Sequence, residues 1–343
     1  MYDKLIQFLV WTVVKPDQAL VMGGTWRIPV LLGLHDKNFI KDLKQDGTFN
    51  ESSFEREYES VWSGSSDDAF FSSEMFDRNR KLNQPEYEFS GRSSKNTYYV
   101  VAVDVGRRGC DTDICILKVN PQPQGSAIKS LVNIVTLSDM HFEDQAITIK
   151  KLFYKYKARQ VVLDGNGLGI GLVDYMVKSQ IDPETGVSLP DFGVTNDPDG
   201  YYKKYRTNDT EYDALYVIKA NAAINTEAHT YIQSQLSSGK IKFLIDERIA
   251  KNKLLGTKRG QEMTTAERAK YLSPFTLTSI LKEEILNLRE ESEGVNIILK
   301  QVNKSIKKDT FSALEYGLYY IHEIEESKKK KKRFNVKDLL LMN

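Results

Sequence analysis

The chain has 343 residues, of which 41% are hydrophobic and 28% are charged. These values are typical of a globular protein with one large domain or two unequal ones, and they exclude a disordered chain. Lys and Arg number 48 against 47 Asp and Glu. This balance argues against a protein that coats nucleic acid by bulk charge, so we expect any nucleic-acid contact to be local.

Neither the N-terminal segment nor the cysteines indicate a membrane or extracellular protein. The apolar opening MYDKLIQFLVWTVVK is short, carries Asp3 and Lys4 and lacks a small-residue cleavage site, so it predicts a core segment. Cys110 and Cys115 fit neither a disulfide framework nor a zinc site. We expect no membrane contact, reduced cysteines and an intracellular compartment.

Composition divides the chain into an arm, a domain and a tail. Residues 1–90 are irregular and polar, with helical pieces expected over 1–14 and 36–44, and they are typical of an arm or linker. Residues 91–327 carry the patterns of a folded domain. Residues 328–343 contain the basic run KKKKKR, for which a disordered solubilising tail is the simplest interpretation.

The patterns in the domain predict an α/β fold. YYVVAVD, DICILKVN and SLVNIVTLSD predict three strands, the first covered on both faces. FEDQAITIKKLFYKY spaces apolar residues at helical intervals, and QVVLD starts another strand. Three strands in a meander, then a helix and a strand, fit an RNase H-like mixed β-sheet flanked by helices, although many α/β domains begin similarly.

Further elements are expected downstream. In chain order they are a helix to Met176, a loop over 181–207, a helix over 212–236, a strand in KIKFLID, a helix over 273–288, an edge strand in NIILKQV and a final helix in KKDTFSALEYGLYYIHEI. Long loops in a compact domain are usually functional or disordered.

Three aspartates stand where these elements begin or end. Asp104 ends the first predicted strand, Asp164 ends QVVLD before a glycine-rich turn, and Asp309 starts the final helix on its sheet-packing face. A partly desolvated carboxylate needs a cation, hydrogen bonds or a shifted pKa. For each acid alone, a turn cap or a helix N-terminal acid is an equally simple explanation.

The set of three acids predicts a metal site. Clustered carboxylates repel one another unless cations neutralise them, and hard oxygen ligands select Mg²⁺ or Mn²⁺. Two such ions, about 4 Å apart, can activate water and stabilise the leaving oxygen in phosphodiester hydrolysis. Other chemistries have weaker signals. The sequence has no GxxxxGK[ST] phosphate loop, so we expect no ATP hydrolysis, and its GNGLGIG is a weak dinucleotide motif.

Several phrases resemble the nuclease domain of tailed-phage large terminases in order and spacing. They run from about Gly23 to Ile324 and include GGTWRIPVLLGLHDKNFIKDLKQD, VVAVDVGRRGCDTDICILKV, VVLDGNGLGIGLVDYMV, SPFTLTSILKEEILNLR and KDTFSALEYGLYYI. The resemblance implies an RNase H-like fold and a two-metal endonuclease that cuts double-stranded DNA during viral genome packaging. It also implies a portal protein and a small terminase subunit as partners, and a phage-encoded protein in the host cell cytoplasm. Residues 1–90 resemble the end of the family's motor domain, and the missing phosphate loop puts packaging by this chain alone in doubt.

The resemblance assigns roles to particular residues. The catalytic and metal-binding acids it implies are Asp104, Asp164 and Asp309. Asp113 is a candidate further ligand, with a turn cap as the simpler explanation, and Glu143 is a weaker option.

DNA contacts require positive charge near the acids. The candidates for DNA contact are basic residues that follow Asp104 or lie in the Tyr-rich loop: Arg107, Arg108, Lys203, Lys204 and Arg206. Solvated surface charge explains each of them equally well.

Two alternatives stay open. The chain could be another RNase H-like nuclease of the resolvase or RNase H type, which hybrid-specific cleavage would favour. It could also be a non-catalytic DNA- or portal-docking module, in which the acids cap turns and no divalent ion is needed.

Overall fold

The computed structural model describes residues 25–36, 38, 40, 58, 69–91, 96–107, 109–206, 213–293 and 296–340. The helix expected over 1–14, and most of that expected over 36–44, lie outside this part of the chain. The chain forms two compact units, Met1–Asp68 and Ala69–Asn343. The first contributes the short helix α2 (Arg27–Leu31), and the second contains all the elements described below.

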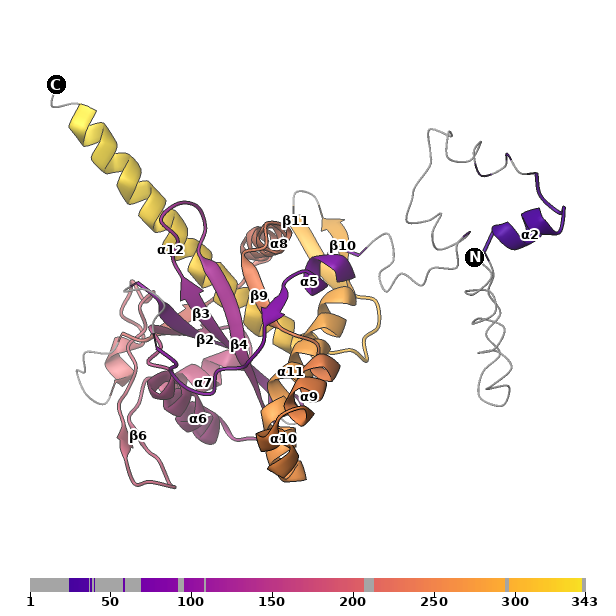
Figure 1. Ribbon diagram of the computed structural model, residues 1–343. Coiled ribbons are helices and arrows are strands. Elements are labelled where there is room, and N and C mark those ends of the chain that lie inside the picture. The colour runs from indigo at the N-terminus through magenta and orange to yellow at the C-terminus, as the bar shows by residue number, and fades with distance from the viewer. Residues whose placement is uncertain are drawn as a thin grey trace. The chain divides into compact units, whose positions relative to one another are not determined.

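The second unit is built on a mixed sheet of seven strands in the order β1-β9-β4-β3-β2-β5-β8 (Figure 1). The strands are β1 (Arg80–Leu82), β2 (Tyr98–Asp104), β3 (Thr112–Asn120), β4 (Ile128–Leu137), β5 (Gln160–Asp164), β8 (Leu215–Ile218) and β9 (Ile241–Leu244). β2, β3 and β4 form an antiparallel meander, whereas β5 lies parallel to β2 and β8 parallel to β5. This arrangement is that of an RNase H-like sheet, which confirms the expected α/β fold class.

Two short hairpins lie outside this sheet. They pair β6 (Gln180–Ile181) with β7 (Ser188–Leu189), and β10 (Leu288–Glu293) with β11 (Asn296–Gln301). The strand expected in NIILKQV is therefore β11, in a hairpin of its own.

Helices cover both faces of the sheet. They are α5 (Ser73–Asp77), α6 (Phe142–Lys155), α7 (Gly169–Met176), α8 (Ala222–Ser237), α9 (Glu247–Leu255), α10 (Lys258–Glu262), α11 (Thr265–Leu286) and α12 (Asp309–Leu340), with the 3₁₀ turn η1 (Lys203–Tyr205). One core, here called the α12 face, joins the sheet to α5, α8, α11 and α12, and the other, the α6 face, joins it to α6 and α7. Among the described helices, none has the length and apolar composition that a membrane crossing requires.

The burial of β2 on both faces explains its uninterrupted apolar sequence. The side chains of Val100, Val101, Ala102 and Val103 are 0% exposed. α12 approaches the sheet closely because it carries Gly317, where a Cβ atom would lie 2.7 Å from both Ala102 Cβ and Leu117 Cδ1. A larger residue there would push α12 away from the sheet.

The helix expected over 212–236 was wrong in its first part. Residues 215–218 form the strand β8, and α8 begins at Ala222. LYVI has the β-branched and aromatic residues of a strand, and Asn221 caps α8 by accepting N–H bonds from Ala223 and Ile224. The helix expected over 273–288 begins earlier, at Thr265, behind a capping box of Thr264 and Glu267.

Both ends of the compact unit extend beyond the expected domain of 91–327. Phe71 and Phe76 are 0% exposed in the core of the α12 face, and β1 pairs with β9, so residues 69–90 contribute to this unit. At the other end the backbone of α12 continues through the basic run to Leu340. The backbone of residues 328–340 is therefore helical, which differs from the disordered tail expected from the sequence. The segment contains no Gly or Pro that would disfavour a helix.

Candidate active site

Three of the predicted acids come from adjacent strands and share one face of the sheet. The Cα atoms pair Asp104 with Asp113, and β5 runs parallel to β2, so that Asp164 ends beside Asp104. Side chains alternate between the two faces along a strand. The neighbours two positions away from these acids lie in the core of the α12 face: Ala102, Cys115 and Val162. Asp104, Asp113 and Asp164 therefore lie on the α12 face, at the same edge of the sheet.

Asp309 comes to this edge from the far end of the sequence. It is the first residue of α12, which packs across β2, β3 and β5. Phe311 and Leu314 fix this end of the helix, because both are buried in the core of the α12 face. We call Asp104, Asp113, Asp164 and Asp309 the acid cluster.

The electrostatics of the acid cluster are those of carboxylates that share a poorly solvated region. Burial, with smaller contributions from the charges of Asp309, Asp164 and Asp113, raises the pKa of Asp104 to about 7, and the charge of Lys308 opposes this rise. Burial also raises the pKa values of Asp113, Asp164 and Asp309 above the usual range. Ionising all four acids is therefore unfavourable unless positive charge is brought to them.

Glu284 is a functional candidate that the sequence analysis missed. This α11 side chain is 2% exposed, and its Oε2 accepts a hydrogen bond of 2.8 Å from the backbone N–H of Phe311 in the first turn of α12. Its Oε1 lies 3.1 Å from the Thr310 hydroxyl. Burial raises the pKa of Glu284 to about 8, with smaller contributions from Asp113 and Asp309. Glu284 is therefore a mainly neutral acid at pH 7 that caps the helix carrying Asp309.

The hydroxyl of Thr310 links Glu284 to the acid cluster. It lies 3.0 Å from Asp113 Oδ2 and 3.1 Å from Glu284 Oε1, and one hydroxyl proton serves one of these two contacts. When Glu284 is protonated, it can donate to Thr310 while Thr310 donates to Asp113, which satisfies both contacts. Asp113 also accepts a bond of 2.6 Å from the Thr136 hydroxyl, so it ties β4 to α12.

The donor chemistry of the acid cluster fits a hard divalent cation. All its ligand atoms are carboxylate oxygens, which suit Mg²⁺ and Mn²⁺. Within the described part of the chain, no three Asp, Glu, His or Cys side chains converge closely enough, as placed, to hold a metal ion. Glu143 lies exposed on α6, which covers the other face.

The basic residues expected to contact DNA do not form one group. Arg107 packs on α6, with its guanidinium 4.8 Å from the ring centroid of Phe142 and 3.1 Å from His141 Nδ1. Arg108 lies outside the described residues. Arg206 is largely buried and pairs at 3.3 Å with both Asp191 and Asp213, so it stabilises its loop and its guanidinium is not offered to a ligand.

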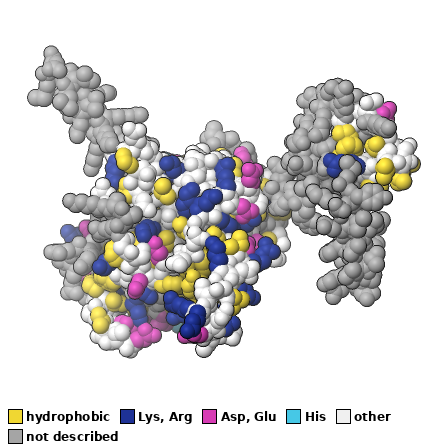
Figure 2. Space-filling model, viewed as in Figure 1, with side chains coloured by type: hydrophobic (Ala, Val, Ile, Leu, Met, Phe, Trp, Pro, Cys, Tyr) yellow, Lys and Arg dark blue, Asp and Glu magenta, His cyan; other side chains and the backbone are white. Residues whose placement is uncertain are grey.

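The two lysines of the Tyr-rich loop are exposed. Lys203 and Lys204 lie in η1, and the Lys204 ammonium is 4.5 Å from the ring centroid of Tyr201 and 4.9 Å from that of Tyr205. Figure 2 shows Lys and Arg side chains interspersed with acidic ones on the visible face, and no continuous basic surface.

Two further lysines lie near members of the acid cluster along the backbone. Lys308 directly precedes Asp309, and its charge lowers the pKa values of Asp104 and Asp309. Lys219 follows β8, whose last residue, Ile218, is the Cα partner of Asp164. Lys308 could have been found from its position beside Asp309, whereas Lys219 was hidden inside a wrongly predicted helix.

Comparisons with known proteins gave structural similarities alone. No family model matches the chain, and no curated protein does. The large terminase nuclease of thermophilic phage G20c with bound magnesium is 11% identical, with 74% of this chain and 97% of that chain covered and a TM-score of 0.39. The P22 large terminase nuclease domain is 12% identical (73% and 91% covered, TM-score 0.35). The HK97 bacteriophage large terminase is 9% identical (85% and 52% covered, TM-score 0.40).

Proposed function

We propose that this chain is a Mg²⁺- or Mn²⁺-dependent DNA endonuclease. The observation that carries the proposal is the acid cluster, in which four carboxylates from β2, β3, β5 and α12 share one edge of an RNase H-like sheet. Burial and the charges of the other three acids raise the pKa of Asp104 to about 7. Titratable groups whose pKa values are shifted by burial and by like charges cluster at functional sites.

In this proposal Asp104, Asp164 and Asp309 jointly hold two cations. When bound, divalent cations neutralise the carboxylates and stabilise the charge on the attacking and leaving oxygens of a phosphodiester. Asp104 and Asp164 contribute rigid ligands from adjacent strands, and Asp309 contributes one from α12. Asp113, whose two oxygens accept bonds from Thr136 and Thr310, holds the first turn of α12 in place and is a candidate further ligand.

The substrate and the setting follow from the sequence phrases quoted above. We propose double-stranded DNA as substrate, with cleavage during viral genome packaging as in a large terminase, in the cytoplasm of a phage-infected host. The portal protein and a small terminase subunit are the partners proposed with this role. The interspersed charges of Figure 2 support local phosphate contacts, for which Lys203, Lys204 and Lys308 are the candidates.

A non-catalytic docking module is the alternative to test. In such a module the acids would cap turns, and replacing Asp by Asn would preserve most of their hydrogen bonds. The large rise in the pKa of Asp104 favours the nuclease, because a turn-capping Asp accepts N–H bonds that lower its pKa.

The decisive experiment is incubation with supercoiled plasmid, with Mn²⁺ and with EDTA. We expect nicking and linearisation with Mn²⁺, no cleavage with EDTA, and a loss of several orders of magnitude in Asp104→Asn. The matched control is Asp144→Asn, an exposed acid on α6, which should cut like the parent chain. Equal cleavage by parent and Asp104→Asn would refute the proposed active site.

A further inference from the structure

A cavity of about 540 Å³ opens at the edge strand β8, which pairs with the strand that ends in Asp164. Its walls are mainly aromatic and aliphatic and include Ile170, Tyr201, Tyr216, Ile218, Ile224 and Tyr319. Volumes of this size, with apolar walls and a few polar groups, are typical of sites for small organic groups. We call it the β8 cavity.

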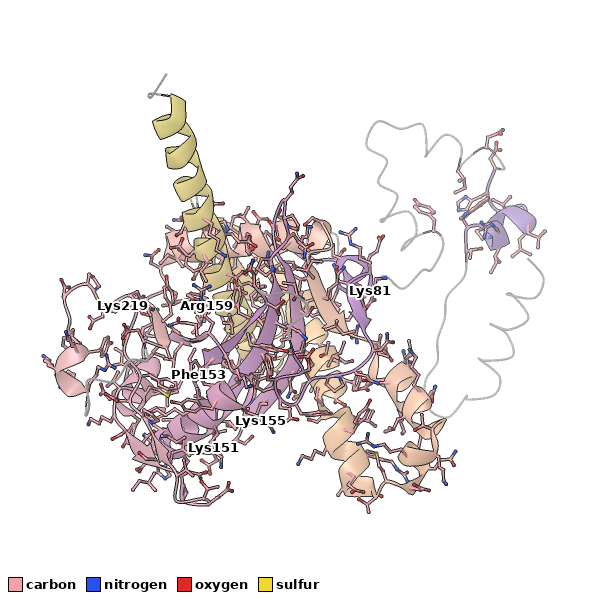
Figure 3. All side chains as sticks on the ribbon, turned by 60° about the vertical axis from the view of Figure 1, so that its left-hand side comes forward. Lys81, Lys151, Phe153, Lys155, Arg159 and Lys219 are labelled. Atoms are coloured by element: carbon pink, nitrogen blue, oxygen red, sulfur yellow. The ribbon has the colours of Figure 1, made fainter. Side chains whose placement is uncertain are left out.

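The β8 cavity lies one strand away from Asp164. Its wall residue Ile218 is the Cα partner of Asp164, one strand away at about 4.8 Å. Lys219, at its rim, packs beside Gly165, where a Cβ atom would lie 3.7 Å from Lys219 Cγ. Figure 3 shows Lys219 on the side of the unit away from Lys81 of β1, as the strand order requires. A nucleotide with its phosphate at Asp164 would therefore have a neighbouring base within reach of the cavity.

The loop that forms the outer wall is anchored at both ends. The Asn196 side chain forms two hydrogen bonds with the backbone of Val217, at 2.7 and 3.0 Å, and so extends the edge of the sheet. At the other end Arg206 pairs with Asp191. Between them, Asp197 accepts the backbone N–H bonds of Tyr201 and Tyr202, at 3.0 and 2.8 Å. The tyrosines are thus held in place before any ligand binds.

The chemistry of the cavity favours a nucleobase over a phosphate. Tyr201 is 54% exposed, and its ring, beside Tyr205 and the Lys204 ammonium, offers a surface on which a base can stack. Asp197 and Asp199 also line the cavity. Two carboxylates repel a phosphate, whereas a carboxylate accepts hydrogen bonds from the amino groups of a base.

We infer that the β8 cavity binds an unpaired nucleobase of the DNA strand that lies at the acid cluster. The inference rests on the proposed nuclease function for its substrate class. Lys219 at the rim contacts the adjoining phosphate, and the tyrosines hold the base. A base in a duplex must leave its stack to enter such a cavity, so the site prefers single-stranded or unpaired segments.

The test measures binding of a short fluorescent single-stranded oligonucleotide in Ca²⁺, without cleavage. Tyr201→Leu should weaken binding roughly tenfold, because base stacking on an aromatic ring is lost. Tyr201→Phe should bind like the parent chain, since it keeps the ring. The matched control is Tyr175→Leu, which removes another exposed tyrosine, 40% exposed on α7 and outside the cavity lining, and should leave binding unchanged. Thermal unfolding checks that each variant is folded.

A second measurement locates the base directly. Irradiation of the complex with an oligonucleotide that carries 5-iodouracil should crosslink to Tyr201, Tyr216 or Tyr319, as mapped by mass spectrometry. Unchanged binding by Tyr201→Leu, or crosslinks confined to residues outside the cavity, would overturn the inference. If the crosslinks lie in the cavity while plasmid is never cut, the cavity stands and the proposed nuclease function fails. If plasmid is cut but the cavity is not crosslinked, the proposed nuclease function stands and the inference about the cavity fails.

Discussion

The interaction between Glu284 and the first turn of α12 leads to a prediction that separates positioning from catalysis. Replacing Glu284 by Leu leaves the N–H of Phe311 buried without its partner, whereas the hydroxyl of Thr310 keeps its bond to Asp113. A buried N–H without a partner costs about 1–3 kcal/mol in the free energy of unfolding. At roughly 2–4 °C per kcal/mol for a unit of this size, the melting temperature should fall by about 2–12 °C.

Glu284→Gln should behave differently because Glu284 is mainly neutral at pH 7. The glutamine oxygen can accept the Phe311 N–H bond, and its amide can donate to Thr310, as the protonated acid does. We expect a stability change of less than about 1 kcal/mol and nearly unchanged cleavage. If Glu284 were itself a charged metal ligand, Glu284→Gln would abolish cleavage.

The assays are thermal unfolding and plasmid cleavage as a function of Mn²⁺ concentration. Glu284→Leu should require more Mn²⁺ for half-maximal cleavage, because Asp309 is no longer held in place. The matched control is Gln235→Leu, which removes a buried 2.8 Å bond to Lys129 Nζ without touching the start of α12. It should destabilise the chain without changing the Mn²⁺ requirement. A Glu284→Leu protein with the parent's Mn²⁺ requirement, or a Glu284→Gln protein as impaired as Glu284→Leu, would refute this reasoning.

Three further predictions follow from charges. The raised pKa values of Asp104 (about 7) and Glu284 (about 8) mean that the folded chain holds these protons more tightly than the unfolded chain. Without metal, the contribution of these two protons to stability is complete below about pH 4 and is lost as the pH rises through about 7–8. Melting temperatures should therefore fall over this range, and Mn²⁺ should raise them more at its upper end. A melting temperature that rises with pH would contradict this. Arg206→Ala should cost about 3–5 kcal/mol by unfolding, since it leaves the fully buried Asp191 without that cation; a change below about 1 kcal/mol would show that the pair is dispensable. Lys308→Gln should weaken duplex binding and reduce its salt dependence by about one counterion, as measured by titration at several salt concentrations, and an unchanged slope would remove Lys308 from the DNA interface.

The elements that the sequence predicted correctly are those whose residues have one dominant requirement. β2 to β5 and α6 combine β-branched runs or helical spacing with burial, so pattern and structure agree. The same patterns placed Asp104, Asp164 and Asp309 at the ends of their elements, and the structure brings them to one edge of the sheet. Their roles as ligands stay predictions.

Long-range pairing determined the features that the sequence did not reveal. Residues 215–218 have mixed preferences, and parallel pairing with β5 makes them a strand. In the sequence Glu284 is an ordinary helix residue. Its role as a cap depends on the start of α12, which lies more than twenty positions later in the chain. The charge of Arg206 predicted a DNA contact, but its guanidinium pairs with Asp191 and Asp213, and a buried ion pair has no signature in sequence.

The acid cluster also predicts that Asp104 lowers the stability of the metal-free chain while it serves the proposed function. Raising the pKa of a carboxyl from 3.8 to about 7 corresponds to a cost on the order of 4 kcal/mol when the group is ionised, which the packing of α12 on the sheet must offset. Asp104→Asn keeps the shape of the side chain and removes that charge. Without metal, at about pH 8, the variant should therefore melt several degrees above the parent chain. With Mn²⁺ the difference between the two melting temperatures should become smaller or change sign, because the parent chain gains more stability from a cation that binds the folded state.

This comparison separates a site arranged for cations from acids that cap turns. A turn-capping Asp keeps most of its hydrogen bonds when it is changed to Asn, and because its N–H contacts favour the charged form, the stability changes little or falls slightly. Melting curves of both proteins with EDTA and with Mn²⁺ measure the difference without any DNA. A less stable Asp104→Asn in EDTA, together with an equal gain from Mn²⁺ in both proteins, would mean that Asp104 holds the backbone and not a metal.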